Sequence, residues 1–424
     1  MNARVAAHRI LRETRGGEFA DRVAERVLPD VAPADRGLAL EIAYGCLRLR
    51  ARIDRWIETY TDRPLARIDA DVLDWIRIGV YELKELRTPD HAAVSEAVGG
   101  ARRAMDTGRA GFVNAVLRAI VRDGKPDPFP SRDTDPLGYL ASWGSHPEWL
   151  LRRWLDRWSA HDVFRLVQAD NAPPPVVLRR LGPGAEEPGD QGLEPLDAWP
   201  SSARLLAGSP AEALRRVRGV IQDPAASAVV DYAGAPVESP VYDACAAPGT
   251  KTALLADAAG GPVLAGDVSR ERLARVRAAA RRLGLPIACA VADARTPPVA
   301  GARTVLADVP CSGTAVLRRR PDARWRIGPA DLAALVDVQG EILTGCARTV
   351  ADGGLLVYST CSLEPEENVD QVERFLDAHP GFAREPNPDA PVPAACLTAE
   401  GDLFVRPWLT GTDGAYAARL RRVR

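Results

Sequence analysis

From Val241 onward, short apolar runs alternate with amphipathic stretches of helical length. The apolar runs predict strands at 241–245, 263–267, 287–293 and 304–308, and a further strand that ends at Tyr358. The stretches between and after them predict helices at 252–259, 269–283, 331–350 and 366–378. This alternation is typical of a doubly wound, mostly parallel sheet with helices on both faces, the Rossmann-like α/β fold.

The first 125 residues follow a different pattern, because their apolar side chains recur three and four positions apart. This spacing predicts an all-α domain, with one helix over 71–86 and another that Asp35 caps and that continues to Trp56. The proline-rich run 125–130 predicts a linker. We therefore expect four parts: a helical domain, a linker, a mixed α/β subdomain and the large α/β domain, at 1–125, 126–146, 147–240 and 241–424.

Composition limits the classes of protein to which the chain can belong. The 424 residues carry a formal net charge of −2, so an electrostatic case for nucleic acid must come from local stretches. The N-terminus lacks the apolar core of a signal peptide, and no apolar run is long enough to span a bilayer. The 7 cysteines show no CxxC spacing, which argues against zinc and a disulfide framework. We expect a cytoplasmic monomer with reduced thiols, no metal and no membrane partner.

Two of the cysteines follow predicted strands closely. Cys311 lies in Asp308-Val309-Pro310-Cys311-Ser312-Gly313, and Cys361 lies in Tyr358-Ser359-Thr360-Cys361-Ser362. Ligands of an open parallel sheet bind beyond the carboxyl ends of its strands, so both thiols can face one substrate. A thiolate is a strong nucleophile, and a second thiol can handle protons. The alternative interpretation is that both are buried core cysteines, as most free cysteines are.

The turn between the first strand and first helix of the sheet reads Asp243-Ala244-Cys245-Ala246-Ala247-Pro248-Gly249-Thr250-Lys251-Thr252. Small residues there allow a ligand to approach the backbone. The turn has neither the phosphate-loop nor the GxGxxG spacing. Asp267, Asp293 and Asp308 end the next three predicted strands, an arrangement that suits a nucleoside-bearing ligand without phosphates, such as S-adenosylmethionine. Taken singly, each of these aspartates is more often a cap or turn residue.

Three motifs together resemble those of the NOL1/NOP2/Sun RNA cytosine-C5 methyltransferases. They are the Asp243–Gly249 turn and the two cysteine segments, and they are joined by Arg320-Pro321-Asp322-Ala323-Arg324-Trp325 and Glu364-Pro365-Glu366-Glu367-Asn368. The resemblance covers residues 145–424. The helical N-terminal part resembles the NusB RNA-binding domain, most clearly at Phe112-Val113-Asn114-Ala115-Val116-Leu117-Arg118. This arrangement is similar to the bacterial Sun/Fmu branch, whose substrate is a cytosine of 16S rRNA.

The resemblance implies an S-adenosylmethionine-dependent enzyme with RNA as partner. It implies that Cys361 is the attacking thiolate, that Cys311 assists removal of the carbon 5 proton and release, and that Asp308 contacts the base. The cofactor-binding residues that we expect are Cys245, Ala246, Ala247, Pro248, Gly249, Thr250, Lys251, Asp267, Asp293 and Asp308. Lys251 either favours the thiolate or contacts cofactor or RNA. Thr250 replaces a second glycine, and the aromatic pair common near the C-terminus is reduced to Tyr416.

Three other functions remain open at this point. A DNA cytosine methyltransferase would use Cys311, the thiol of its Pro-Cys pair, as the nucleophile, whereas Thr360-Cys361 favours the RNA type. A tRNA cytosine would serve the same chemistry as 16S rRNA. The NusB-like part alone would suit a non-enzymatic RNA-binding or antitermination factor. The basic stretches 215–218 and 318–320 suit RNA phosphates, although charged stretches are also common on solvated faces.

Overall fold

The computed structural model describes residues 1–182, 193–196, 199, 203–206 and 208–423. The chain forms two compact units. Unit 1 comprises Met1–Pro173 together with Leu317–Arg326, and unit 2 comprises Pro174–Val316 together with Ile327–Arg424. This division follows packing, and the four sequence domains expected above stay predictions.

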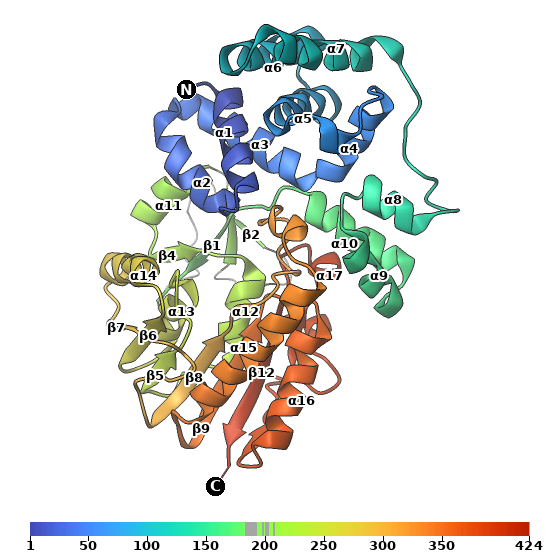
Figure 1. Cartoon of the computed structure of the whole chain (residues 1–424). Helices are drawn as coiled ribbons and strands as arrows, with labels where there is room; N and C mark the ends of the chain where they lie inside the picture. The colour runs from blue at the N-terminus through green and yellow to red at the C-terminus, as the bar shows by residue number, and fades with distance from the viewer. Residues whose placement is uncertain (183–192, 197–198, 200–202, 207, 424) are drawn as a thin grey trace. The chain divides into compact units, whose positions relative to one another are not determined.

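Unit 1 is built of helices (Figure 1). They are α1 Ala3–Arg15, α2 Ala20–Val27, α3 Pro33–Arg48, α4 Arg50–Thr59, α5 Ala70–Lys84, α6 Asp90–Ala104, α7 Thr107–Asp123, α8 Pro136–Ser142, α9 Glu148–Arg157 and α10 Ala160–Asn171. The expectation that one helix runs from Asp35 to Trp56 was wrong, because α3 ends at Arg48 and α4 begins at Arg50. Proline at the first position of α3, rather than an Asp35 cap, starts that helix.

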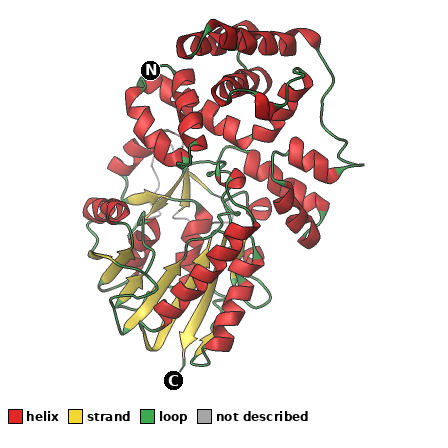
Figure 2. Ribbon diagram, viewed as in Figure 1, coloured by secondary structure: helices red, strands yellow, loops and turns green. Residues whose placement is uncertain are grey.

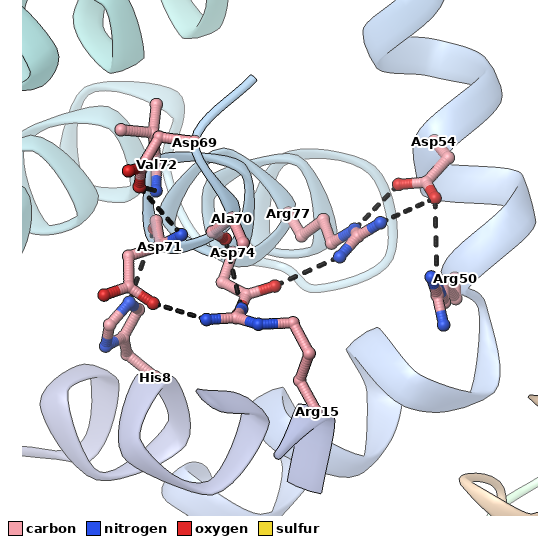
Figure 3. Close-up of polar contacts among 10 residues, drawn as sticks. All are labelled: His8, Arg15, Arg50, Asp54, Asp69, Ala70, Asp71, Val72, Asp74 and Arg77. Atoms are coloured by element: carbon pink, nitrogen blue, oxygen red, sulfur yellow. Dashed lines mark hydrogen bonds and ion pairs between the residues drawn. The ribbon is translucent and has the colours of Figure 1, made fainter. Parts of the chain in front are cut away.

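A buried ionic network joins α1, α4 and α5 within unit 1 (Figure 3). Asp74 is 3% exposed and accepts hydrogen bonds from Arg15 and from Arg77, the latter at 3.1 Å. Arg77 also donates to both carboxylate oxygens of Asp54, at 2.7 and 2.8 Å. His8 stacks on Trp75 in the same region, with ring centroids 4.6 Å apart. Charges from segments distant in sequence therefore fix how these helices pack.

The segment Leu317–Arg326 belongs to unit 1 although it follows the Cys311 motif in the chain. Arg324 is 1% exposed, and its guanidinium donates to the carbonyl oxygens of Arg48, Ser145 and Asp170 at 3.0–3.1 Å. It also donates to the side chain of Asn171 at 2.9 Å. Burial lowers its pKa to about 10. Arg324 therefore ties the ends of α3 and α10 together.

Unit 2 holds two sheets (Figure 2). The smaller one is antiparallel in the order β2-β3-β1-β4, with strands β1 Val177–Arg180, β2 Leu193–Pro195, β3 Ala203–Leu206 and β4 Gly219–Ile221. The larger follows the order β10-β12-β9-β8-β5-β6-β7, with β11 paired to β12. Its strands are β5 Val241–Asp243, β6 Val263–Asp267, β7 Ile287–Val291, β8 Ala302–Asp308, β9 Val350–Thr360, β10 Phe382–Arg384, β11 Leu403–Val405 and β12 Ala415–Arg422.

The strands β5 to β9 of the larger sheet are parallel, and those at the C-terminal end are antiparallel. The helices of unit 2 are α11 Pro210–Arg216, α12 Pro224–Ala233, α13 Thr250–Ala258, α14 Arg270–Leu283, α15 Pro329–Ala347, α16 Val369–Ala378 and α17 Pro407–Thr410. Neighbouring residues of β9 face opposite layers: Val357 packs in the cluster that includes α12 and α13, and Tyr358 packs in the cluster of α15 and α16. The expected doubly wound, mostly parallel sheet is confirmed.

Several expected boundaries differ from those observed; strand β5, for example, ends at Asp243 rather than at Cys245. β7 ends at Val291, so Asp293 lies beyond the strand rather than at its end. β9 continues to Thr360, which places Cys361 directly after it. The expected helix over 366–378 is interrupted at Asn368, whose φ of −115° and ψ of −108° are not helical. In the described part of the chain, no helix is long and apolar enough to cross a membrane.

Candidate active site

The two cysteines that the sequence singled out come together beyond the adjacent strands β8 and β9. The strands are in register at Asp308 and Ser359, and both chains then turn into loops. The Sγ atoms of Cys311 and Cys361 are 3.2 Å apart, and the backbone N–H of Cys361 donates to Cys311 Sγ at 3.2 Å. Two thiols at this distance can act on the same substrate atom or on neighbouring ones.

The surroundings of Cys311 favour its protonated form. Its hydrogen bond with Cys361 and its burial raise the pKa of Cys311 well above the ordinary value. A thiol with a raised pKa is a poor nucleophile and a competent proton carrier. Cys311 is therefore a protonated thiol in this arrangement.

Asp308, at the end of β8, is bound on both sides. Lys251 donates to one of its carboxylate oxygens at 2.7 Å, and Ser359 Oγ donates to the other at 2.8 Å. Burial alone would lower the pKa of Lys251, but the Asp308 carboxylate raises it above its ordinary value. Lys251 is therefore a cation whose charge is felt at Cys361, and Asp308 is fixed in orientation by its two donors.

The turn between β5 and α13 approaches α14 closely at Gly249. Gly249 has φ +104°, and a Cβ there would lie 3.0 Å from the Cα of Val276, so a side chain is excluded by conformation and by space. Asp243, at the end of β5, is 1% exposed and accepts from Thr252 Oγ1 at 2.7 Å. Burial raises the pKa of Asp243 to about 7.

Asp267 lies at the end of β6, as the sequence predicted. It is 4% exposed and accepts from the backbone N–H groups of Ala247 at 3.3 Å and Ser269 at 2.8 Å. Asp293, in contrast, is at the surface, where Arg295 donates to it at 2.7 Å and lowers its pKa. The Asp267 carboxylate joins the β5 turn to the start of α14, whereas Asp293 is engaged by its own loop.

The β5, β6 and β8 ends have features that fit a nucleoside-bearing ligand. The buried Oδ1 atom of Asp243 has no hydrogen-bond partner among the described residues, so a ligand donor can satisfy it. Val268, directly after Asp267, is 65% exposed, which offers an apolar surface for a flat ring. Sequence reasoning missed Val268, although an apolar residue directly after a strand-end carboxylate was a visible signal.

Sequence reasoning also assigned no role to several residues around the cysteine loops. Glu367, Gln339 and Ser312 are buried together, and Asn368 lies beside them. The segment 364–368 matched a motif, but the contacts of its side chains could not be read from the pattern. Within the described ranges, no cluster of three or more His, Cys, Asp or Glu side chains could hold a metal ion.

Comparison with known proteins matches two regions of the chain to two families. Residues 234–421 match the family described as 16S rRNA methyltransferase RsmB/F, and residues 1–122 match the NusB family. A ribosomal RNA small subunit methyltransferase B from Pseudomonas syringae pv. tomato is 33% identical over 450 residues, covering 100% of this chain and 97% of its own. The protein of that name from Pseudomonas putida is 32% identical, covering 100% of this chain and 99% of its own.

Solved structures share the fold. The crystal structure of PH0851 has a TM-score of 0.77 at 20% identity, and the match covers 100% of this chain and 99% of that one. A methyltransferase homologue from Pyrococcus horikoshii has a TM-score of 0.55 at 23% identity, covering 68% of this chain and 99% of its own. These likenesses support the α/β methyltransferase fold of unit 2.

The fold and the family matches define an enzyme of the methyltransferase class. The chain belongs to the 16S rRNA methyltransferase RsmB/F family and carries an N-terminal NusB-family region, which confirms the resemblance noted from its motifs. The interpretation as a non-enzymatic RNA-binding factor is thereby set aside.

Proposed function

We propose that this protein is an S-adenosylmethionine-dependent RNA cytosine-C5 methyltransferase that forms 5-methylcytosine in 16S rRNA through a covalent adduct. The observation that carries the proposal is the pair of thiols 3.2 Å apart beyond adjacent parallel strands, beside the Lys251–Asp308 ion pair. The names of relatives that match nearly the whole chain support the choice of 16S rRNA.

The proposed reaction begins with Cys361. Its thiolate adds to carbon 6 of cytosine, which makes carbon 5 nucleophilic, so one difficult step becomes two easier ones. A bound S-adenosylmethionine would supply the electrophilic methyl group, which carbon 5 takes as the methyl–sulfonium bond breaks, with S-adenosylhomocysteine as the leaving group. In the last step Cys311, acting as the thiolate, takes the carbon 5 proton; the electrons of that C–H bond restore the double bond and expel the Cys361 thiolate from carbon 6.

Asp308 and Lys251 serve the base and the nucleophile in this scheme. Asp308 hydrogen-bonds the base at N3 and N4 as charge develops in the adduct, since its orientation is fixed in advance by Lys251 and Ser359. The Lys251 cation raises the positive potential near Cys361, which favours the thiolate. Cofactor or RNA contact by Lys251 is the alternative, and its ion pair with Asp308 supports the first role.

The cofactor is assigned to the ends of β5, β6 and β8. The turn Cys245–Lys251 provides close backbone approach, Asp267 accepts the ribose hydroxyls, and the Asp243 oxygen without a partner accepts a further ligand donor. We also propose that Asp293 accepts a hydrogen bond from the adenine amino group. Its carboxylate would then accept from the ligand and from Arg295 at the same time. These groups bind and orient the methyl donor next to Cys361.

RNA is the proposed macromolecular partner. The NusB-family region and the basic stretch 215–218 supply positive charge for phosphates. Of the stretch 318–320, Arg318 is 4% exposed, so Arg320 is its best candidate for a phosphate contact. A tRNA substrate remains the alternative, since the chemistry at the thiols would be the same.

Two cysteine variants test the proposal on a denaturing gel with RNA and tritiated S-adenosylmethionine. Cys361→Ala should abolish methyl transfer and the covalent band while cofactor binding survives. Cys311→Ala should accumulate an RNA-dependent covalent band, because release is impaired. If Cys361→Ala gives the band and Cys311→Ala does not, the roles are those of a DNA-type enzyme and the proposal fails.

The choice of substrate is tested separately. We expect 16S rRNA from a strain that lacks the protein to accept tritium from S-adenosylmethionine when the purified enzyme is added. The tRNA of that strain serves as the control and should stay unlabelled. Label in tRNA and none in 16S rRNA would replace the rRNA assignment with the tRNA alternative.

A further inference from the structure

Glu367 and Asn368 are consecutive buried residues that the proposed chemistry does not use. Their exposed fractions are 0% and 3%. They lie between the 3-10 turn Pro365–Glu367 and α16, where the non-helical backbone of Asn368 interrupts the helical path. Because of this interruption, the two neighbouring side chains point to different loops.

Glu367 holds the chain on both sides of Cys311. Its Oε1 atom accepts from the backbone N–H of Ser312 at 2.8 Å, and its Oε2 atom accepts from Ser312 Oγ at 2.5 Å. Oε1 also accepts from Gln339 Nε2 at 2.8 Å, and the same Gln339 amide donates to the carbonyl of Pro310 at 3.0 Å. The residues before and after Cys311 are thus fixed by one carboxylate and its amide partner.

Asn368 holds the chain on both sides of Cys361 in the same manner. Thr360 Oγ1 donates to Asn368 Oδ1 at 2.5 Å, and Asn368 Nδ2 donates to the carbonyl of Ser362 at 2.9 Å. The two loops are also braced against each other, because Ser312 Oγ and Ser362 Oγ lie 3.0 Å apart. Each thiol therefore has its own support, and the supports are adjacent in sequence.

We propose that Glu367 and Asn368 are positioning residues with divided tasks, Glu367 for Cys311 and Asn368 for Cys361. The inference rests on the proposed function, because it assumes that Cys361 attacks and Cys311 releases. On that basis Glu367 governs release of the methylated base, and Asn368 governs formation of the adduct. Displacement of a reacting group by about 1 Å can slow a step by roughly a hundredfold, so such supports matter.

The residue types suit these tasks. An ionised carboxylate only accepts hydrogen bonds, and Glu367 receives three donors. A side-chain amide both donates and accepts, and Asn368 does both. Glu367→Gln would turn an NH₂ group toward a donor, and Asn368→Asp would turn a carboxylate toward the Ser362 carbonyl. These two substitutions change hydrogen bonding with almost no change in shape, and they form a matched pair.

The test follows both steps in single-turnover reactions of the full-length variants with RNA and tritiated S-adenosylmethionine. Glu367→Gln should slow release about tenfold to a hundredfold and accumulate the covalent band, with adduct formation nearly unchanged. Asn368→Asp should slow adduct formation by a similar factor without accumulation. In the double variant Cys311→Ala/Glu367→Gln, release should be no slower than in Cys311→Ala, because both changes act through one thiol.

A merely structural role would give a different result. Both substitutions would then lower the melting temperature and slow the two steps in equal proportion, and either this outcome or unchanged kinetics in both variants overturns the inference. Should either variant fail to fold, Ser312→Ala and Thr360→Val remove the hydroxyl donors to Glu367 and Asn368, together with the other hydrogen bonds of those hydroxyls, and should reproduce the same split. If the single variant Cys311→Ala traps no adduct, the proposed function itself is wrong. This result is obtained without any Glu367 variant, so the two failures can be told apart.

Discussion

Asp74 in unit 1 and Glu367 in unit 2 are both carboxylates removed from solvent, and their partners differ in kind. Asp74 accepts from two arginines, Arg15 and Arg77, which in turn reach other carboxylates (Figure 3). Glu367 accepts from a backbone N–H, a hydroxyl and an amide, all of them neutral donors. The first arrangement joins helices, and the second fixes two loops.

The difference has an energetic meaning. Removing one partner from a buried ion pair leaves an uncompensated charge and is strongly destabilising, whereas neutral donors contribute less each and act mainly through direction. Burial still raises the pKa of Asp74, because two nearby guanidinium groups do not fully replace water. We therefore expect the unit 1 network to govern stability and the unit 2 network to govern reaction rates.

The largest effect is expected for Arg77→Met. Arg77 bridges Asp54 and Asp74, so its loss leaves two carboxylates short of a cation in a buried site. We expect a loss of about 3–5 kcal/mol in the free energy of unfolding, measured by denaturant titration. Arg118→Met, which changes an exposed side chain that donates to Asn114, is the control and should change stability by less than about 0.5 kcal/mol.

The Arg77→Met variant also tests whether the unit 1 network affects stability alone and leaves the reaction rate unchanged. Its surviving folded fraction should form the Cys361 adduct at the wild-type rate, because the thiol loops keep all of their supports. A variant that stays fully folded yet loses adduct formation would mean that the unit 1 network serves chemistry as well as stability.

Asp243 is a buried carboxylate that has no cation within hydrogen-bond distance among the described residues, so its variants test the effect of burial. Its pKa is about 7 in the folded protein and about 3.9 in an unfolded chain, so the folded state binds the proton more tightly. The stabilisation is present below about pH 4 and is lost as pH rises through 7. Asp243→Asn should therefore raise stability by about 2–4 kcal/mol at pH 8 and leave it nearly unchanged at pH 4.

The control for this experiment is Asp377→Asn, which changes an exposed carboxylate. Melting curves of both variants from pH 4 to pH 8 give the comparison. Equal stability changes at both ends of the range for Asp243→Asn would show that its carboxyl group is ionised throughout.

The sequence predicted the parts of the site that depend on strand ends, and the physical reason is local. The apolar runs before Asp267, Asp308 and Cys361 predict strands. Because ligands of a parallel sheet bind at the carboxyl ends of its strands, the residues that follow these runs are predicted to lie in the site. The structure confirms those positions for Asp267 and Asp308. Asp293 was expected at a strand end, but β7 ends at Val291, and Asp293 lies in the loop that follows, where it pairs with Arg295.

Other features could not be predicted because they depend on contacts between distant segments. The interruption at Asn368 occurs within a sequence of good helical periodicity, and hydrogen bonds to Thr360 and Ser362 accompany it. The burial of Arg324 in unit 1 requires carbonyl groups from three separate segments. Periodicity reports which face of an element is apolar, and it carries no information about such partners.

Asp267→Ala removes a carboxylate at a strand end that belongs neither to the Asp74 network of unit 1 nor to the Glu367 network of unit 2. Loss of a charge-assisted acceptor should weaken S-adenosylmethionine binding by about 1.5–3 kcal/mol, or roughly tenfold to a hundredfold in Kd. RNA affinity should change little. Calorimetric titration of each ligand, with a melting curve, checks both statements. Asp293→Ala is the matched control and should weaken cofactor binding less, because Arg295 already engages that carboxylate.

The smallest effect is expected for His8, at the edge of the Asp74 network. His8 is 6% exposed and stacked on Trp75, and burial lowers its pKa despite the nearby carboxylates of Asp74 and Asp71. The unfolded chain takes up a proton near pH 6.5, which the folded protein resists, so this contribution to stability is lost as pH falls below about 6.5.

His8→Phe keeps a ring against Trp75 and cannot titrate. Its free energy of unfolding should therefore fall less than that of the wild type between pH 7 and pH 5. Denaturant titrations at the two pH values measure this difference. An identical pH dependence in the two proteins would show that His8 is protonated in the folded state, and that the carboxylates of the network, rather than burial, determine its charge.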